Sequence, residues 1–167
     1  TNSANYTLTQ PVNLQADITA RNLTVTGLSV NTKIYNKSDV ATLGGAGTLV
    51  GVQGSDNVNL DTSSANARFV DANVGTGKGV TVTGLTLGGT AAGNYTLTQP
   101  SGLTGDITAK SITVTADVAT KVYGDTDATF SYQVTNGSLE AGDVFTGALG
   151  RATGETIGTY ALTQGNL

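Results

Sequence analysis

Acidic side chains are the residues of this sequence that are best able to do chemistry. Asp125 and Asp127 lie two residues apart in a Gly-Asp-Thr-Asp stretch, and Ca²⁺ prefers clustered carboxylate oxygens as ligands. An EF-hand loop also needs a glycine five residues after its first Asp, where this chain has Phe130. We favour an ordinary turn, in which each Asp bonds its own backbone, and the sequence leaves calcium binding open.

Paired carboxylates could also hydrolyse a glycosidic bond. Glu140, Asp143 and Glu155 are the nearest candidates, but they lie among turn-forming residues without an aromatic platform for a sugar. The chain has no His and no Cys, which excludes Ser-His and Cys-His nucleophilic pairs, thiolate metal sites and disulfides. We therefore expect no catalytic residue, no metal site and no cofactor, and the chain is not predicted to be an enzyme.

Two glycine-rich stretches approach nucleotide-binding motifs without matching them. Residues 75–79 read Gly-Thr-Gly-Lys-Gly, but a phosphate loop also needs Gly where this chain has Ala72, and Ser or Thr where it has Gly79. Residues 44–47 read Gly-Gly-Ala-Gly, and Val50 occupies the third glycine position of a dinucleotide fingerprint. We interpret residues 75–79 as a glycine-rich hairpin connection.

Charge and hydropathy exclude two classes of partner. The formal net charge is −4 and the isoelectric point is about 4.4, which disfavours a surface that neutralises phosphates, so we expect no nucleic-acid partner. No stretch approaches the roughly 18 apolar residues of a membrane span, so we expect no membrane insertion. The sequence Asn-x-Ser/Thr occurs five times, which leaves glycosylation open, at Asn5, Asn22, Asn36, Asn94 and Asn136.

The elements that must position these residues are β-strands. The chain has 30 Thr and 23 Gly but only 2 Pro, and Thr fits a pleated surface while Gly supplies the positive φ of tight turns. Apolar residues alternate with Thr in residues 23–25, 80–82 and 112–114, which is the period of half-buried antiparallel strands. The sequence predicts an all-β fold of small antiparallel β-sandwich modules with Ig-like proportions. A β-grasp-like module with one short helix is the alternative.

Glycines predict where the strands bend. The alternation slips by one residue at Gly27 and at Gly84, and a slip exchanges the inward and outward faces, so we expect a sharp bend at each. Asn136-Gly137 is typical of a hairpin turn. Residues 138–149 are the one stretch in which we expect a short helical turn.

A long repeat divides the chain into modules. The phrase Asn-Tyr-Thr-Leu-Thr-Gln-Pro occurs at residues 5–11 and again at residues 94–100, and residues 5–27 agree with residues 94–116 at 15 of 23 positions. A weaker echo lies at residues 160–164. The repeats of a solenoid have periods of about 20–50 residues, so a repeat at an offset of 89 indicates complete domains.

The positions of these phrases set the expected boundaries. We expect residues 1–18 to end a preceding module, residues 19–107 to form one whole module and residues 108–167 to form a second, shorter type, possibly truncated. Residues 17–24 and 106–113 contain no Pro and no Gly-Ser run, unlike a flexible linker. The prediction is a stiff, elongated monomer whose partners are neighbouring modules of the same chain.

The first module resembles a known family. Residues 69–87 read Phe-Val-Asp-Ala-Asn-Val-Gly-Thr-Gly-Lys-Gly-Val-Thr-Val-Thr-Gly-Leu-Thr-Leu, and Ala-Gly-Asn-Tyr-Thr-Leu follows at residues 92–97 with Asp-Ile-Thr at residues 106–108. This ordered phrase closely resembles the YDG-type repeat of filamentous-haemagglutinin-like adhesins and covers most of the module. It departs where the repeat takes its name, because Tyr-Asn-Lys-Ser at residues 35–38 replaces Tyr-Asp-Gly-Thr.

The second module resembles the companion MBG-type domain. The resemblance rests on Thr-Val-Thr-Ala at residues 113–116, Lys-Val-Tyr-Gly-Asp at residues 121–125, Gly142-Asp143, Gly150-Arg151 and Gly-Thr-Tyr-Ala at residues 158–161. The two resemblances imply a very large exoprotein that a Gram-negative bacterium secretes across its outer membrane by a two-partner pathway. They supply no catalytic residue that could be transferred to this sequence.

Two functions follow from the resemblance. We favour a structural stalk or spacer of a secreted, cell-surface adhesin that takes part in adhesion, aggregation or biofilm formation. The alternative is a carbohydrate-binding module of the same adhesin, in which exposed Tyr and loop residues recognise an exopolysaccharide or host glycan. Aromatic residues are 5% of the chain and Trp is absent, so stacking platforms for a sugar are sparse.

Overall fold

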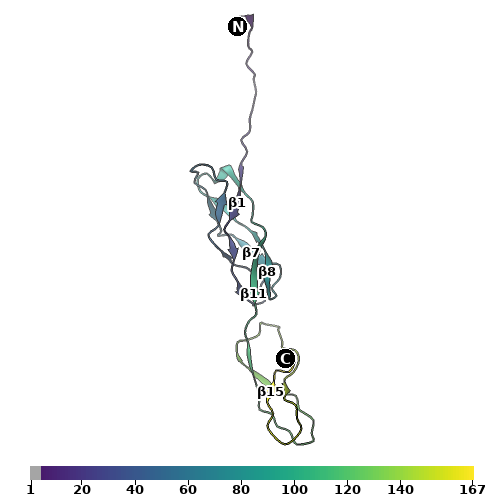
Figure 1. Ribbon diagram of the computed structural model, residues 1–167. Helices are drawn as coiled ribbons and strands as arrows, with labels where there is room; N and C mark the ends of the chain where they lie inside the picture. The colour runs from purple at the N-terminus through teal and green to yellow at the C-terminus, as the bar shows by residue number, and fades with distance from the viewer. Residues whose placement is uncertain (1–4) are drawn as a thin grey trace.

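The computed structural model describes residues 5–167 and shows an elongated chain in three consecutive parts (Figure 1). Residues 5–18 form an extended segment, residues 21–108 hold the eleven strands of a first module, and residues 113–163 hold the four strands of a second module. Helical structure in the described residues is limited to 3₁₀ turns such as η2 (Ala92–Asn94). The predicted all-β class is confirmed. Within residues 5–167, no helical segment has the length and apolar character that crossing a membrane would require.

The strands of the first module are short, because glycine turns interrupt the chain between them. Their bounds are β1 (Arg21–Thr26), β2 (Ser29–Val30), β3 (Lys33–Ile34), β4 (Leu43–Gly44), β5 (Thr48–Val50), β6 (Asn59–Asp61), β7 (Asn66–Phe69), β8 (Gly75–Thr83), β9 (Thr86–Gly88), β10 (Tyr95–Leu97) and β11 (Leu103–Thr108). They form a four-stranded sheet in the order β3-β11-β8-β7, a three-stranded sheet in the order β10-β1-β5, and the pairs β2-β4 and β6-β9.

Strand β8 lies inside the four-stranded sheet, and its sequence explains that position. Val80 and Val82 point into the core while Thr81 between them faces solvent, as the alternation predicts. The strand pairs antiparallel with both β7 and β11. Residues 75–79, interpreted above as a hairpin connection, are instead the first half of β8, because their backbone pairs with β11.

Most strand pairs are antiparallel, and two are parallel. Strand β10 runs parallel to β1 with Tyr95 opposite Arg21, and β11 runs parallel to β3 with Ile107 opposite Lys33. A parallel pair needs a long connection between its strands, which here is most of the module. The repeated phrase at residues 94–108 therefore closes the module by adding its last two strands to its first ones.

The first module has an apolar core. Phe69, Val82, Leu85 and Ile107 are only 1–3% exposed and pack in one cluster. Full burial of such a side chain contributes on the order of 1.5–3 kcal/mol. Ile107 lies in β11, the last strand, so the core is complete only when that strand is in place.

Gly27 and Gly84 make the bends that the slips in alternation predicted. Their φ angles are 75° and 78°, in the left-handed region that favours glycine. A Cβ at Gly84 would lie 2.3 Å from the carbonyl oxygen of Ser64, so a larger residue does not fit. Leu85 is buried directly after the bend, which confirms that the chain changes face there.

The second module is thinner than the first. Its antiparallel pairs are β12 (Thr113–Ala116) with β13 (Tyr132–Asn136) and β14 (Gly150–Arg151) with β15 (Leu162–Thr163). Among the described residues, the fully buried apolar side chains belong to the first module. The second module instead has a local contact between Tyr132 and Phe145, whose rings meet edge to face with 5.9 Å between centroids.

Two local predictions for the second module are wrong. Asn136-Gly137 ends β13, which pairs with the preceding β12, so this turn does not join β13 to a following strand. Gly137 still has a positive φ of 77°, and a Cβ there would lie 2.7 Å from the carbonyl oxygen of Ser111. Residues 138–149 contain a turn at residues 141–142 but no helix. The turn residues were identified correctly, whereas the strand partner depends on contacts that lie far along the chain.

Candidate functional site at the module junction

The two modules contact each other through polar side chains where they meet. Tyr35 and Lys37 follow β3 of the first module, and Asp143 follows a turn of the second. The Tyr35 hydroxyl donates a hydrogen bond to Oδ2 of Asp143 at 2.9 Å, and Oδ1 of the same carboxylate lies 2.8 Å from Nζ of Lys37. Lys37 Nζ also donates to the backbone carbonyl of Ala141 at 2.7 Å. One turn of the second module is thus held by two side chains of the first.

A second ion pair crosses the same junction. Lys110 lies in residues 109–112, which connect β11 to β12, and its Nζ is 2.5 Å from Oε1 of Glu140. Both side chains are partly buried, at 29% and 26% exposure. Glu140 and Asp143 belong to one turn, in which the Asp143 N–H donates to the Glu140 carbonyl at 2.9 Å. The two ion pairs therefore fix the same turn at two points.

Hydrogen bonding sets the protonation states at the junction. The hydrogen bonds from Lys37 and then Tyr35 lower the pKa of Asp143 below its usual value. The hydrogen bond to Asp143 raises the pKa of Lys37, and the same carboxylate raises the pKa of the Tyr35 hydroxyl. At neutral pH the junction consequently has an ionised Asp143 between a cation and a neutral hydroxyl.

The backbone of Lys37 is strained. Its φ is 60°, in the left-handed region that residues other than glycine rarely adopt. The turn around it is braced, because the Ser38 N–H donates to Oδ1 of Asn36 at 3.2 Å and Lys33 Nζ donates to the Ser38 carbonyl at 2.7 Å. Strained residues persist where the surrounding structure holds them, often at functional positions. Here the turn presents the Lys37 side chain to the second module.

Comparison with known families identifies both modules. Residues 19–102, half of the chain, match the family model of the YDG domain. The chain belongs to the YDG domain family. Residues 112–167 match the model of the MBG domain (YGX type), so the first module is a YDG module and the second an MBG module, as the resemblance predicted. The presence of YDG and MBG domains suggests that the two modules are repeat domains of an adhesin-like protein. No curated protein matches the chain, and neither does a solved structure.

The departure of this chain from the YDG phrase lies at the junction. Lys37 occupies the glycine position of Tyr-Asp-Gly-Thr, and a glycine would take a positive φ without strain. Lys37 takes the same conformation and gains its contacts with Asp143 and Ala141. Sequence reasoning did not identify Tyr35, Lys37 or Lys110 as functional. The replaced glycine was nevertheless a signal for Lys37.

Two candidate acids of the MBG module take part in an ionic cluster. Arg151 Nε lies 2.9 Å from Oδ1 of Asp127, and Lys121 Nζ lies 2.6 Å from Oε2 of Glu155 and 3.3 Å from Asp127. Arg151 also pairs with Glu155 and lies over the ring of Tyr160 at 5.2 Å. These contacts lower the pKa of Asp127, through Arg151 first, and that of Glu155, through Lys121 first.

The other candidate acids lie in turns or at the junction. Asp125 takes an ordinary turn geometry, because its N–H donates to the Val122 carbonyl and its own carbonyl accepts from Lys121, both at 3.1 Å. Glu140 and Asp143, considered above for glycoside hydrolysis, are each bound by a lysine at the junction. Throughout residues 5–167, acidic side chains do not form a group of three or more that could hold a metal ion.

The groups that a phosphate loop would use are occupied in residues 75–79. Lys78 Nζ lies 2.8 Å from Oδ1 of Asp71. The Gly77 N–H donates to Oδ1 of Asp106 at 2.8 Å, which ties the stretch to β11. The contacts of residues 75–79 therefore stabilise the four-stranded sheet.

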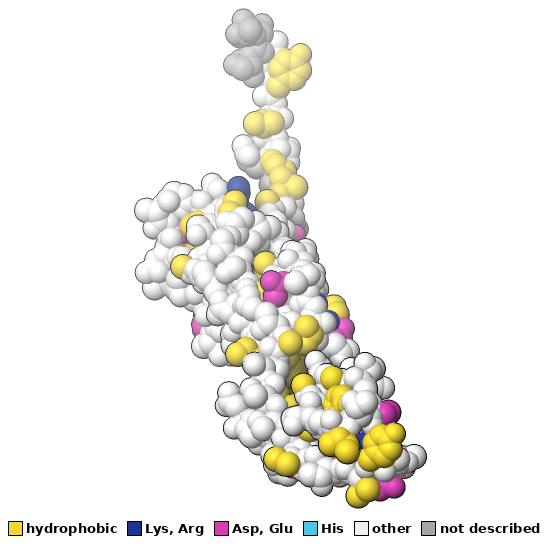
Figure 2. Space-filling view, turned by 60° about the horizontal axis from the view of Figure 1, so that its bottom comes forward, with side chains coloured by type: hydrophobic (Ala, Val, Ile, Leu, Met, Phe, Trp, Pro, Cys, Tyr) yellow, Lys and Arg dark blue, Asp and Glu magenta, His cyan; other side chains and the backbone are white. Residues whose placement is uncertain are grey.

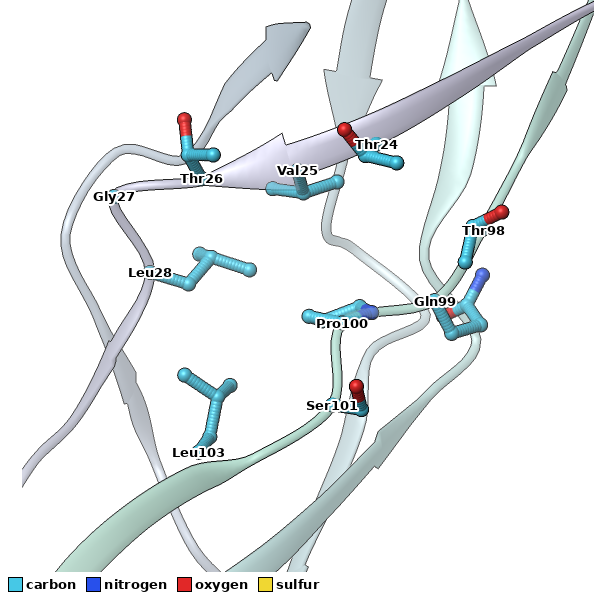
Figure 3. A pocket seen from close by; sticks show the side chains of 10 residues that line it. All are labelled: Thr24, Val25, Thr26, Gly27, Leu28, Thr98, Gln99, Pro100, Ser101 and Leu103. Carbon is cyan, nitrogen blue, oxygen red and sulfur yellow. The ribbon is translucent and has the colours of Figure 1, made fainter.

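A shallow groove of about 280 Å³ lies on the YDG module, between β1 and the chain that follows β10 (Figure 3). Its lining side chains are those of Thr, Ser, Val, Leu, Pro and Gln, none of which is aromatic or charged. Gln99 is used by the fold, because its amide accepts from the Leu85 N–H at 3.1 Å and donates to the Leu85 carbonyl at 2.8 Å. The groove thus offers no aromatic ring on which a sugar could stack.

Proposed function

We propose that the chain is a stiff structural spacer, part of the stalk of a large secreted bacterial adhesin. The junction supports this proposal, because the Lys37–Asp143 and Lys110–Glu140 pairs fix one turn of the MBG module to the end of the YDG module. Residues 109–112 between β11 and β12 read Ala-Lys-Ser-Ile, without Gly or Pro. Bending at this point would break several contacts at once, so the modules resist it.

The composition and the family fit the same proposal. A chain without Cys forms no premature crosslink while it passes unfolded through an outer-membrane pore. Outside the cell, a rod of such modules would hold a binding region away from the bacterial surface in adhesion, aggregation or biofilm formation. The chain itself would be a monomer without enzymatic activity, and its partners would be neighbouring modules.

Small-angle X-ray scattering of the chain tests the stiffness directly. We expect the profile of a single rod, with a maximum dimension that matches the end-to-end arrangement of the modules in Figure 1. Raising the salt concentration should shorten this dimension only slightly, because partly buried ion pairs are screened less than exposed ones. A compact particle, or a broad mixture of bent shapes at low salt, would contradict the proposal.

Carbohydrate binding is the alternative that a second experiment addresses. A glycan array and a polysaccharide pull-down with the chain should give no saturable binding, because the groove of Figure 3 has no aromatic lining. Saturable binding that a Tyr123→Ala substitution abolishes would establish the alternative, since Tyr123 is an exposed aromatic residue. Tyr132→Ala is the matched control, because Tyr132 packs against Phe145.

A further inference from the structure

Residues 5–18 expose apolar side chains along an extended segment (Figure 2). Five of these side chains are at least 78% exposed, including Tyr6 and Ile18. Their counterparts in the second copy of the repeated phrase, Tyr95 and Ile107, are only 8% and 1% exposed, within the YDG module. Apolar side chains that are exposed in one copy of the phrase and buried in the other indicate an interaction surface.

Residues 5–18 contain the same side chains with which residues 94–107 bind the rest of the YDG module. The polar side chains of residues 94–107 that bind the rest of the module include three: Tyr95 binds Asp56 and Gln53, Gln99 binds Leu85, and Asp106 binds Gly77. The segment has the identical residues 89 positions earlier: Tyr6, Gln10 and Asp17. The apolar residues Leu97, Leu103 and Ile107 also have identical counterparts: Leu8, Leu14 and Ile18.

The differences between the two copies are informative. Residues 5–18 and 94–107 are identical at ten of fourteen positions, and three of the four differences replace exposed residues. One of the three is Gly102, which has a φ of 73° where its counterpart Asn13 has a φ of 60°. Asn is among the few residues that adopt this conformation readily. The segment thus has a left-handed residue at the position that Gly102 occupies between β10 and β11.

The fourth difference lies at a tight contact. A Cβ at Gly105 would lie 2.6 Å from Cγ1 of Val30 and 3.2 Å from Cε1 of Phe69. The counterpart of Gly105 is Ala16, which has that Cβ. The segment therefore fits poorly onto a YDG module with valine at the Val30 position.

We propose that residues 5–18 supply the last two strands of a second YDG-type module and bind its remaining strands as β10 and β11 do here. We further propose that Ala16 restricts the segment to a module with a smaller side chain at the Val30 position. The partner is consequently a different YDG-type module rather than a second copy of this one. Selectivity of this kind prevents the segment of one chain from displacing β10 and β11 of another.

A chain with additional residues at its N-terminus tests the proposal. Its outcome does not depend on the stiffness of the junction between the YDG and MBG modules. Residues 19–93 are placed directly before Asn5, so that Gly93 precedes Asn5 as it precedes Asn94. Hydrogen exchange then compares the unextended protein, the extended chain and the extended chain with Ala16→Gly. With Ala16→Gly, we expect the amides of residues 6–18 to exchange about 100-fold more slowly than in the unextended protein. With Ala16 retained, the protection should be roughly tenfold weaker, because an extra methyl group overpacks the site.

Two outcomes would overturn the proposal. If residues 6–18 exchange as fast in the extended Ala16→Gly chain as in the unextended protein, or if the added residues 19–93 stay unprotected, the segment does not complete a YDG-type module. If the two extended chains are equally protected, Ala16 is not selective. Tyr6→Ala in the extended Ala16→Gly chain should remove the protection, whereas Val12→Ser, which restores the residue found at Ser101, should not. The amides of β10 and β11 serve as the internal reference in every chain.

Discussion

The YDG and MBG modules hold short strands together by different means. The YDG module buries side chains such as Leu23 and Ile107 almost completely. The MBG module relies instead on Arg151 and its contacts with Asp127 and Glu155. Apolar burial does not depend on the protonation of side chains, whereas ion pairs to carboxylates do. Two modules of one chain can therefore differ in the conditions that they withstand.

The junction resembles the MBG interior in this respect. Its contacts are ion pairs and hydrogen bonds to Asp143 and Glu140. Acid should therefore loosen the junction and the MBG module together while the YDG core persists. Four predictions test this distinction between the two modules.

The largest effect is expected from truncation in the YDG core. Ile107→Ala should lower the free energy of unfolding of the YDG module by about 2–5 kcal/mol, because it leaves a cavity at the centre of the sheet. The matched change in the MBG module, Ile157→Ala, should have an effect within about 0.5 kcal/mol, because Ile157 is 93% exposed. Urea unfolding followed by circular dichroism measures both. Equal effects would remove the distinction between the modules.

Overpacking of the same sheet should have the next largest effect. Gly105→Ala should destabilise the YDG module by about 1–3 kcal/mol, because the added Cβ meets Val30. Gly102→Asn is the control and should cost less, because the site is open and Asn13 adopts the same backbone conformation in the other copy. Thermal unfolding compares the two variants. A larger loss for Gly102→Asn would show that the turn, and not the close contact, limits the sequence.

Acid should act on the MBG module through Asp127 and Glu155. The pKa of each is lower in the folded chain than its ordinary value, so their ion pairs stabilise the fold above about pH 4 and lose this effect as the pH falls through the lowered values. Arg151→Gln should destabilise the MBG module at pH 7, and the difference from the unsubstituted chain should shrink below about pH 4. Hydrogen exchange in β14 and β15 at several pH values measures this.

The control for the acid prediction lies in the YDG module. Arg68 pairs with Asp39 at 2.8 Å, but both side chains are largely exposed, so Arg68→Gln should change YDG stability little at either pH. If the loss of MBG stability caused by Arg151→Gln does not vary with pH, Arg151 acts through packing on Tyr160 and not through its charge.

The smallest effect on stability is expected at Lys37. Lys37→Gly removes the contacts with Asp143 and Ala141 but relieves the positive φ. YDG stability should therefore stay unchanged or rise slightly in thermal unfolding, although the junction loses the Lys37–Asp143 ion pair. Lys37→Ala is the matched control, since it removes the same contacts and keeps the backbone strain, and it should be less stable than Lys37→Gly.

Local patterns predicted the strands and bends of this chain well. The alternation around Val80 and Val82 and the slip at Gly84 report on neighbours within a few residues, which is why the structure confirms them. Pairing between distant segments has no such local signal. The parallel pairing of β10 with β1 and the inclusion of residues 75–79 in β8 depend on which strands meet in space.

The junction was beyond sequence reasoning for a related reason. Glu140 and Asp143 drew attention as acids, but their partners Lys110 and Lys37 lie 30 and 106 residues away. From the sequence alone, turn formation explains the two acids as well as a contact between modules does. Only the replacement of the YDG glycine by Lys37 gave a hint, and its meaning needed the positive φ of that residue.

The distance between the two modules is the most direct test of the central claim that the junction is stiff. The chain has no Cys, so Thr81→Cys and Val134→Cys, on exposed positions of β8 and β13, place spin labels on the two modules alone. Double electron–electron resonance at pH 7 should give one narrow distribution of the distance between the two labels, and Lys37→Gly should broaden it. A broad distribution in the chain with Lys37 intact, or one that Lys37→Gly leaves unchanged, would contradict the account.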